Sequence, residues 1–384
     1  MPIYGLSFLM PRSKRIWVLG STFGKRFADN PKYFFLYLNQ YRTIQIRAVW
    51  ISKEKEVIKQ LRDNQLEGYY LYSLKGIWFS LRSKVYLYDN YSKDICFPLS
   101  GGALKINLWH GIPLKKIQKD NRFDHVRNPK SRWAKMRWWL RRISDEKPSD
   151  YVLATSEFLR AFFESAFGTK HVIVSGYPRN DNLNSVRIQN VVTDQEKEMM
   201  EYVNLQKKEC RIVFYLPTFR NSEADFFNVI DANRLLAFLG QEKILFIVKL
   251  HPKSKVKEKF KRLNGNHILV IDPVWDPYPV LSLTDVLVTD YSSVYFDFLL
   301  TGKQVIFFPY DLKEYLRDTR EMYFDYEEFT PGVKAYDQDE LEAAILHPVF
   351  YQKEKESILE KTYTDPEGFA SEELYDNIMK ILNQ

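Results

Sequence analysis

The nine residues ILFIVKLHP, at positions 244–252, set the pattern on which the fold of this chain depends. The first five are all apolar and three of them are β-branched, which favours an extended strand. A run this short, without polar alternation, is typical of a strand buried on both faces of a parallel sheet. The polar side chains that follow, Lys249, His251 and Lys253, then mark the carboxyl end of that strand.

Similar apolar runs recur along the whole chain and alternate with amphipathic, helical patterns, which predicts an α/β protein with parallel sheets. A polar stretch at residues 182–209 separates two such halves. We therefore expect two Rossmann-like domains, residues 1–185 and 186–384, facing a central cleft, with the last helix packing back on the N-terminal domain. The predicted strands are residues 15–20, 43–52, 68–74, 85–88, 105–108, 151–154 and 172–175 in the first half, and 211–216, 244–250, 267–271, 285–290 and 304–308 in the second.

The composition excludes several classes of protein. The chain has 384 residues, of which 45% are hydrophobic and 27% charged, so we expect a folded globular protein. Its two cysteines, Cys96 and Cys210, exclude a disulfide scaffold and favour a reducing compartment. No apolar run reaches the roughly 18 residues of a spanning helix, and the first ten residues make a poor signal peptide. We therefore expect a cytosolic chain, whose net charge of +7 suits anionic partners.

Two of the six histidines come directly after predicted strands, one in each half. His110 lies in WHGIPLKK, residues 109–116, where Gly111 allows a close approach of the backbone. An ordinary histidine pKa of about 6.5 suits a general base that deprotonates a hydroxyl nucleophile. Lys115 and Lys116 suit a phosphate, although a pair of lysines is equally typical of a solvated surface. The alternative for His110 is a histidine that only caps a loop.

The second half carries a matching set of polar residues. His251 and Lys249 suit a diphosphate, because positive charge stabilises a phosphate leaving group. The alternative for His251 is a turn residue with incidental charge nearby. In TDYSS, residues 289–293, Ser292 and Ser293 predict a helix start that binds an anion, or simple capping without a ligand. Asp290 fits beside a phosphate only if it meets a hydroxyl, a nucleobase or a cation. Histidines and carboxylates show no spacing typical of a metal site, so none is predicted.

A basic aromatic helix is predicted near residues 128–143. Residues 127–142 contain seven Lys or Arg, and no acidic residue falls between Asp124 and Asp145. Several apolar side chains share one arc, which is typical of a helix lying in an anionic membrane surface. Docking of this helix on the core is the alternative, and nucleic acid ranks third. The residues expected at the membrane are Trp133, Arg137, Trp139, Arg141 and Arg142.

Taken together, these motifs resemble the CDP-glycerol glycerophosphotransferase family, the teichoic acid primases and polymerases. The likeness spans roughly residues 15–345 in a consistent order. It departs modestly at Ile112, where threonine is frequent, and at Phe219, where tryptophan is frequent. The matching segments are WVLGS (17–21), DNPKY (29–33), WHGIPLKK (109–116), GYPRND (176–181), LPTFR (216–220), KLHP (249–252), TDYSSV (289–294), FFPYD (307–311) and YFDYE (323–327).

The resemblance implies a GT-B-like fold, with an acceptor and membrane-side domain at residues 1–185 and a CDP-donor domain at 186–384. It implies transfer of glycerol phosphate, or a related alditol phosphate, from a CDP donor to a lipid-linked acceptor hydroxyl, with release of CMP. By this resemblance, His110 and His251 are catalytic, His110 as the base on the acceptor side. The residues expected to bind donor or phosphate are Lys115, Lys116, Arg179, Thr218, Arg220, Lys249, Asp290, Ser292 and Ser293.

The partners implied are CDP-glycerol or CDP-ribitol, a polyprenyl diphosphate saccharide acceptor and the cytoplasmic face of the cell membrane, to which the enzyme binds peripherally. No nucleic acid and no tightly bound cofactor are expected, and dependence on Mg²⁺ is left open. Two alternatives stay open at this point. One is a GT-B glycosyltransferase that uses a nucleotide sugar, and the other is a membrane-surface protein without catalysis. Primase or polymerase activity, wall polymer or capsule, and the oligomeric state are not decided by the sequence.

Overall fold

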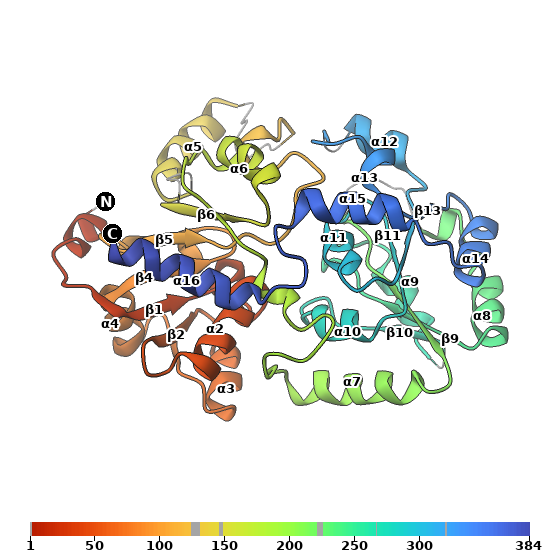
Figure 1. The fold of residues 1–384 in the computed structure, drawn as a ribbon, viewed down its shortest axis with the longest axis horizontal. Coiled ribbons are helices and arrows are strands. Elements are labelled where there is room, and N and C mark those ends of the chain that lie inside the picture. The colour runs from red at the N-terminus through yellow and green to blue at the C-terminus, as the bar shows by residue number, and fades with distance from the viewer. Residues whose placement is uncertain (1, 124–130, 146–148, 221–225, 266, 319–320) are drawn as a thin grey trace. The chain divides into compact units, whose positions relative to one another are not determined.

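The computed structural model describes residues 2–123, 131–145, 149–220, 226–265, 267–318 and 321–384 (Figure 1). The chain divides into two compact units. The first unit comprises Met1–His110, Ile117–Thr193 and Lys361–Gln384, and the second comprises Gly111–Lys116 and Asp194–Glu360. The sequence predicts a division between residues 185 and 186, but the chain passes into the second unit at Asp194. In addition, Gly111–Lys116 belongs to the second unit and Lys361–Gln384 belongs to the first.

The first unit is built on a seven-stranded sheet in which every neighbouring pair of strands is parallel. The strand order is β3-β2-β1-β4-β5-β6-β7, so the direction of winding changes between β1 and β4. A reversal of this kind places a crevice at the carboxyl ends of the two strands concerned. The strands are β1 (Ser13–Leu19), β2 (Arg47–Ser52), β3 (Gly68–Tyr70), β4 (Ser83–Tyr88), β5 (Leu104–Asn107), β6 (Tyr151–Ala154) and β7 (Val172–Val174).

Helices cover both faces of this sheet. Trp17 of β1 packs against Phe34 and Tyr375, whereas its neighbour Val18 belongs to a buried cluster with Phe79. Because adjacent residues of a strand point to opposite faces, these contacts place α2 and α16 on one face and α4 on the other. The helices of this unit are α1 (Pro2–Ser7), α2 (Asp29–Tyr41), α3 (Lys55–Asp63), α4 (Leu74–Arg82), α5 (Arg132–Asp145), α6 (Arg160–Phe167) and α16 (Ala370–Asn383).

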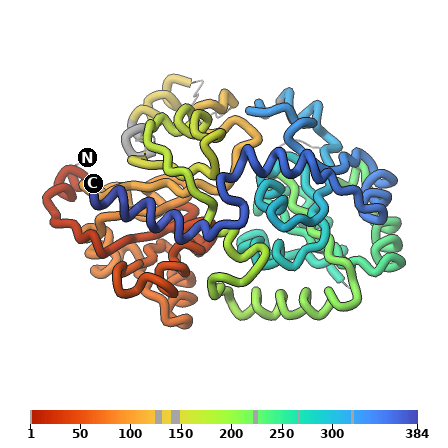
Figure 2. The backbone as a smooth tube through the Cα atoms, in the orientation of Figure 1, coloured from red at the N-terminus to blue at the C-terminus, as the bar shows by residue number. Residues whose placement is uncertain are grey.

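The C-terminal helix α16 is an integral part of the first unit. Its end lies beside the start of β1, where the Lys14 Nζ donates to the Leu382 carbonyl at 2.6 Å (Figure 2). Its beginning is capped by Asp181, which accepts from the Ala370 amide at 2.8 Å and from the Ser371 amide at 3.1 Å. Burial raises the pKa of Asp181 to about 7. The last helix of the chain is therefore held at both ends to the first unit, and it covers the same face of the sheet as α2.

The second unit holds a six-stranded parallel sheet in the order β10-β9-β8-β11-β12-β13, with its winding reversal between β8 and β11. The two-residue strand β13 has no counterpart among the predicted strands, because it is too short to produce a recognisable pattern. The strands are β8 (Arg211–Tyr215), β9 (Ile244–Val248), β10 (Ile268–Val270), β11 (Val286–Thr289), β12 (Gln304–Phe307) and β13 (Val333–Lys334).

Helices surround this second sheet as well (Figure 1). They are α7 (Asp194–Gln206), α8 (Ala232–Gln241), α9 (Lys257–Arg262), α10 (Tyr278–Leu283), α11 (Val294–Leu299), α12 (Leu312–Asp318), α13 (Tyr326–Phe329), α14 (Gln338–Leu346) and α15 (Gln352–Thr362). Segment 111–116 joins this unit through its backbone: Lys116 N donates to the Glu321 carbonyl at 2.8 Å, and Tyr323 N donates to the Leu114 carbonyl at 2.9 Å.

Candidate active site

His110 lies at the carboxyl edge of the first sheet, three residues after β5 ends. Its Nδ1 lies 3.1 Å from the backbone carbonyl oxygen of Asp89, the first residue after β4. A carbonyl oxygen can only accept, so this contact assigns the proton of the neutral ring to Nδ1. The Nε2 atom is then left with a lone pair, which is the state a general base requires.

The backbone around His110 is strained and firmly held. Trp109 adopts a φ of 49°, in the left-handed region that a bulky residue rarely occupies. Its amide donates to the Asn107 Oδ1 at 2.9 Å, and its carbonyl accepts from the Asn30 Nδ2 at 2.9 Å. The Trp109 ring lies against the His110 imidazole with 3.9 Å between ring centroids. Strain that is held in place by its surroundings is typical of functional loops.

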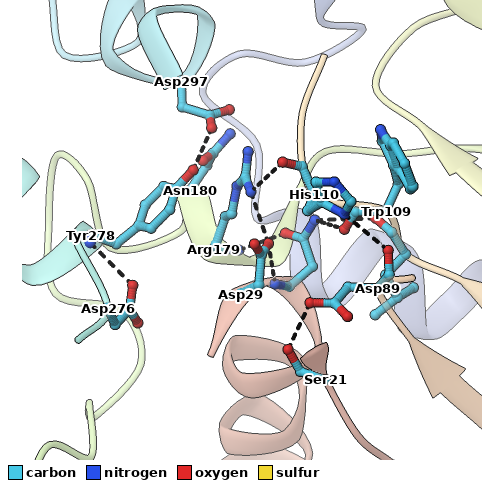
Figure 3. A network of polar contacts seen from close by, with 12 residues as sticks. Ser21, Asp29, Asp89, Trp109, His110, Arg179, Asn180, Asp276, Tyr278 and Asp297 are labelled. Carbon is cyan, nitrogen blue, oxygen red and sulfur yellow. Dashed lines mark hydrogen bonds and ion pairs between the residues drawn. The ribbon is translucent and has the colours of Figure 1, made fainter. Parts of the chain in front are cut away.

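Arg179 lies beside His110, and its side chain is buried rather than exposed at the surface. Its side chain is 4% exposed, and its guanidinium donates to the Asp29 Oδ1 at 2.8 Å and to the His110 carbonyl at 2.9 Å (Figure 3). Burial raises the pKa of Asp29, while Arg179 and His110 oppose that rise. The structure therefore gives Arg179 a position beside the predicted base and a carboxylate partner within the chain. Its assignment to the donor phosphate stays a prediction.

A buried pair of carboxylates supports the same edge of the sheet. Asp89 accepts from the Ser21 hydroxyl at 2.7 Å and from the Thr22 amide at 3.0 Å (Figure 3). Asp94 accepts from the Phe23 amide at 2.8 Å, and its pKa is raised well above the ordinary value by burial and by Asp89. Sequence reasoning did not single out these acids, because no motif marks them. Their one signal is that Asp89 directly follows a predicted strand.

In the second unit, Arg220 lies between two buried carboxylates. It contacts the Asp290 Oδ2 at 2.7 Å and the Asp311 Oδ2 at 2.7 Å, and all three side chains are at most 8% exposed. Although burial disfavours its charge, the two acids raise the pKa of Arg220 above its ordinary value. Tyr291 Oη donates to the Asp311 Oδ1 at 2.9 Å. From the sequence, Asp290 is expected to contact a hydroxyl, a nucleobase or a cation. In the structure it contacts a cation, the guanidinium of Arg220.

The Nδ1 atom of His251 accepts a hydrogen bond, whereas the Nδ1 atom of His110 donates one. The Lys253 amide donates to the His251 Nδ1 at 3.2 Å, so the proton of the neutral ring is assigned to Nε2. The imidazole is exposed and lies against the Phe219 ring, with 4.6 Å between ring centroids. Lys249 is half-buried, and its Nζ donates to the Pro273 carbonyl at 2.9 Å.

The remaining predicted phosphate ligands of the second unit fall into two groups. Thr218 donates its amide to the Asp290 Oδ1 at 2.9 Å, and its buried hydroxyl has no protein partner in the described part of the chain. Ser292 and Ser293 are half-buried just before α11, and the Ser293 hydroxyl makes no capping hydrogen bond. The structure therefore brings Thr218, Arg220 and Asp290 together at the winding reversal between β8 and β11.

The two lysines after His110 contact residues of the second unit, to which their segment belongs. Lys116 Nζ pairs with the Glu321 Oε2 at 3.2 Å, and Lys115 Nζ lies 5.7 Å from the centroid of the Tyr315 ring. Both lysines are half-buried. The WHGIPLKK motif is therefore divided between the units, with His110 in the first and the lysines in the second.

The predicted membrane helix corresponds to α5, which spans Arg132–Asp145. Trp133 and Trp139 are 74% and 64% exposed, and Arg137 is exposed as well. The side chains of Arg141 and Arg142 lie outside the described residues. Among the described residues, no helix is long and apolar enough to cross a membrane, and no cluster of three or more histidine, cysteine or acidic side chains is placed to hold a metal ion.

Comparison with known proteins relates this site to a reaction class. Residues 3–380 match the family model described as CDP-glycerol:poly(glycerophosphate) glycerophosphotransferase. A teichoic acid poly(glycerol phosphate) polymerase of Bacillus spizizenii is 28% identical over 86% of this chain and 84% of its own length. A teichoic acid poly(ribitol-phosphate) polymerase of the same species is 29% identical over 77% of this chain, which spans 46% of that relative.

Among solved structures, the wall teichoic acid polymerase TagF, in a variant soaked with CDPG, matches with a TM-score of 0.75 and 23% identity, over 99% of this chain and 93% of that one. This likeness confirms the predicted GT-B-like class of α/β fold, with two Rossmann-like sheets. The family match extends over nearly the whole chain and contains both sets of site residues. The chain therefore belongs to the CDP-glycerol:poly(glycerophosphate) glycerophosphotransferase family and is a transferase of teichoic acid synthesis.

Proposed function

We propose that this enzyme transfers an alditol phosphate from CDP-glycerol or CDP-ribitol to a hydroxyl of a lipid-linked acceptor and releases CMP. The reaction class rests on the family to which the chain belongs. Both alditols are kept, because the relatives include a glycerol phosphate and a ribitol phosphate polymerase at similar identity. The family favours this reaction over sugar transfer from a nucleotide sugar and over a membrane protein without catalysis.

The observation that carries the proposed chemistry is the opposite hydrogen bonding of the two histidines. His110 donates from Nδ1 to a carbonyl oxygen, whereas His251 accepts at Nδ1 from an amide. In their neutral forms, His110 therefore presents a lone pair at Nε2 and His251 presents an N–H. A lone pair suits the removal of a proton from an alcohol, and an N–H suits an anionic phosphate oxygen.

In the proposed step, the His110 Nε2 takes the proton of the acceptor hydroxyl. The hydroxyl oxygen attacks the β-phosphorus of the donor, and a new phosphodiester bond forms. The bond between the β-phosphorus and the bridging oxygen breaks, and its electron pair leaves on CMP. The His251 Nε2–H stabilises negative charge on the diphosphate as this bond breaks. The rest of the acceleration comes from positioning both substrates.

The paired side chains are proposed to hold this arrangement in place. Arg179 and Asp29 fix the His110 carbonyl, and Arg220 with its two acids fixes the loop that carries Thr218. The unpaired hydroxyl of Thr218 is then proposed as a direct donor to a phosphate oxygen. Because Arg220 faces two carboxylates, we assign it to positioning the loop rather than to neutralising the donor.

We further propose that the enzyme works peripherally at the cytoplasmic face of the membrane, with α5 against anionic lipid. The support is the exposure of Trp133 and Trp139 on a helix whose described cations have no acidic neighbour within the helix before Asp145. Tryptophan prefers the headgroup level of a bilayer, and basic residues are attracted to anionic lipid. A lipid-linked acceptor would be met at that surface.

The direct test is acceptor-dependent release of CMP by the full chain. CDP-glycerol and CDP-ribitol are offered separately with a short-chain lipid diphosphate disaccharide, and UDP-glucose serves as the control donor. We expect CMP from one or both CDP-alditols only when acceptor is present, and no UDP from the control. Release of UDP with sugar transfer to the acceptor, without any CMP, would contradict the proposal.

A further inference from the structure

The N-terminal segment of the chain exposes an unusual amount of apolar surface. Residues 2–10 contain no charged side chain. Four apolar side chains of this segment point into solvent: Ile3 is 59% exposed, Leu6 62%, Phe8 54% and Leu9 80%. Single exposed apolar residues are ordinary, but a contiguous group of them on a folded protein marks an interaction surface.

This segment is not a frayed tail, because Arg12 clamps it to the first unit. The Arg12 guanidinium donates to the carbonyls of Ser80 and Ser83, both at 2.9 Å, and to those of Leu99 and Gly101, at 2.7 and 2.5 Å. On the segment itself, the Ser7 Oγ accepts from the Gly101 amide at 2.9 Å, and the Tyr4 ring stacks on Phe97. The backbone that carries the exposed side chains is therefore held in place on the first unit.

Helix α4 extends the same surface. Arg82 donates to the Pro11 carbonyl at 2.5 Å and lies over the Trp78 ring at 5.6 Å, so the end of α4 lies against the segment that follows α1. Trp78 is 53% exposed, and Leu74, one helical turn earlier, is 89% exposed. The α1–α4 patch, as we call it, consists of Ile3, Leu6, Phe8, Leu9, Leu74 and Trp78.

The two segments that build the α1–α4 patch carry charge of one sign, and the acid directly before the second segment, Glu67, lies close to Lys75. These segments, residues 2–28 and 68–88, contain Arg12, Lys14, Arg15, Lys75, Arg82 and Lys84 among their cations but no aspartate or glutamate. The whole chain contains 49 acidic residues, so their absence from these two segments is a local feature. Apolar side chains on segments rich in cations suit an anionic bilayer, because the apolar side chains insert while the cations meet headgroups.

A second copy of the chain fits this surface less well. A symmetric dimer through the patch would bring the same residues of both copies together. The cations of one copy would then face those of the other, with no acid in these segments to neutralise them. An anionic lipid surface supplies the missing negative charge, so the bilayer is the occupant that the observations favour.

We propose that the α1–α4 patch is a second membrane-binding surface, separate in sequence and in its side chains from α5. In this arrangement Leu6, Leu9 and Trp78 enter the boundary between headgroups and acyl chains, and Lys75 and Lys84 contact anionic headgroups. The proposal concerns binding alone, so it depends on neither histidine and stands or falls separately from the phosphotransfer reaction.

The first experiment measures the partition of the full chain onto phosphatidylglycerol-containing vesicles. The variant Leu6→Ser/Leu9→Ser/Trp78→Ser is compared with Val186→Ser/Leu205→Ser/Val274→Ser, whose positions are equally exposed but lie elsewhere. We expect the patch variant to bind about tenfold more weakly, because three apolar side chains no longer leave water, and the control to bind like the wild type. Equal binding of all three proteins would overturn the proposal.

A second measurement keeps the proposal testable if the triple variant folds poorly. An environment-sensitive fluorophore is attached at Leu9→Cys in a chain with Cys96→Ala and Cys210→Ala. We expect its emission to shift to the blue with anionic vesicles and much less with neutral ones. An unchanged spectrum would overturn the proposal. So would a lipid-free dimer that the patch variant converts to monomer, because the patch would then be an interface between copies.

Discussion

At the residue scale, the chemistry depends on what two imidazole rings are bonded to. The partner of the His110 Nδ1 is a backbone carbonyl, and that of the His251 Nδ1 is a backbone amide. Neither partner is visible in a sequence, because every residue has both groups. The two histidines could be predicted as site residues from their places after strands. Which ring nitrogen carries the proton in each neutral imidazole could not be predicted.

The carboxylate that holds Arg179 gives a first prediction at this scale. In the variant Asp29→Asn, the buried guanidinium keeps an acceptor but loses its counter-charge. We expect the free energy of unfolding to fall by about 1–3 kcal/mol, measured by urea titration. Asp63→Asn, which breaks the exposed pair with Lys59, is the control and should change it by less than about 0.5 kcal/mol. A loss no larger than that of the control would count against a structural pair at Asp29.

Two arginines allow a sharper comparison, since each contacts two carboxylates. Arg220 and its acids are buried, whereas Arg234 is 48% exposed beside Asp339 and Glu342. Arg220→Met leaves two buried acids facing each other, so we expect a loss of about 3–5 kcal/mol in unfolding free energy. Arg234→Met should cost at most about 1 kcal/mol. Similar losses for the two variants, measured by denaturant titration, would show that burial does not distinguish these clusters.

At the scale of elements, the apolar runs located all twelve predicted strands, and the bounds of ten of them shifted by at most two residues. The strand expected over residues 68–74 ends at Tyr70, and α4 begins at Leu74. The strand expected to start at residue 43 starts at Arg47, because the chain turns before it. The sequence could not predict that residues 111–116 belong to the second unit. It depends on backbone pairing with residues 321–323, more than 200 positions away, and such pairing leaves no local pattern.

Asp181, the cap of α16, gives a prediction about pH. Burial raises its pKa from an ordinary 3.8 to about 7, so between those values the folded state holds a proton that the unfolded state has released. Stability contributed by this group is therefore present at low pH and lost as pH rises towards 7. We expect the unfolding free energy of the wild type to fall between about pH 4 and pH 7 relative to that of Asp181→Asn. Parallel pH profiles for the two proteins would contradict the raised pKa.

Helix α5 gives a prediction about binding. In Trp133→Ser/Trp139→Ser, the two exposed tryptophans of the helix are lost, while its cations and the exposed Met136 stay. We expect binding to anionic vesicles, measured by sedimentation, to weaken about tenfold, and Val186→Ser/Leu205→Ser to leave it unchanged. High salt should weaken the remaining binding further, because Arg137 and its neighbours act through charge. Unchanged sedimentation of the tryptophan variant would refute the proposed face of α5.

At the scale of the whole molecule, the two units use the same construction. In each sheet, an aspartate directly follows the strand on one side of the winding reversal and binds the loop that follows the strand on the other side. Asp89 accepts from the Thr22 amide at 3.0 Å, and Asp290 accepts from the Thr218 amide at 2.9 Å. The sequence indicated two Rossmann-like halves and the positions of their strand ends. It did not indicate the hydrogen bond from each aspartate to the neighbouring loop, because the surrounding residues show no internal repeat.

The central claim is that His110 removes the proton from the acceptor hydroxyl. The most direct test is the rate of CMP release from the CDP-alditol that proves active, at saturating acceptor, for His110→Ala and for His171→Ala, an exposed histidine of the same unit. We predict that His110→Ala is slower by a factor of about 10² to 10⁴, as expected for loss of a general base, while His171→Ala matches the wild type. A folded His110→Ala protein that releases CMP within a few-fold of the wild-type rate would contradict the account.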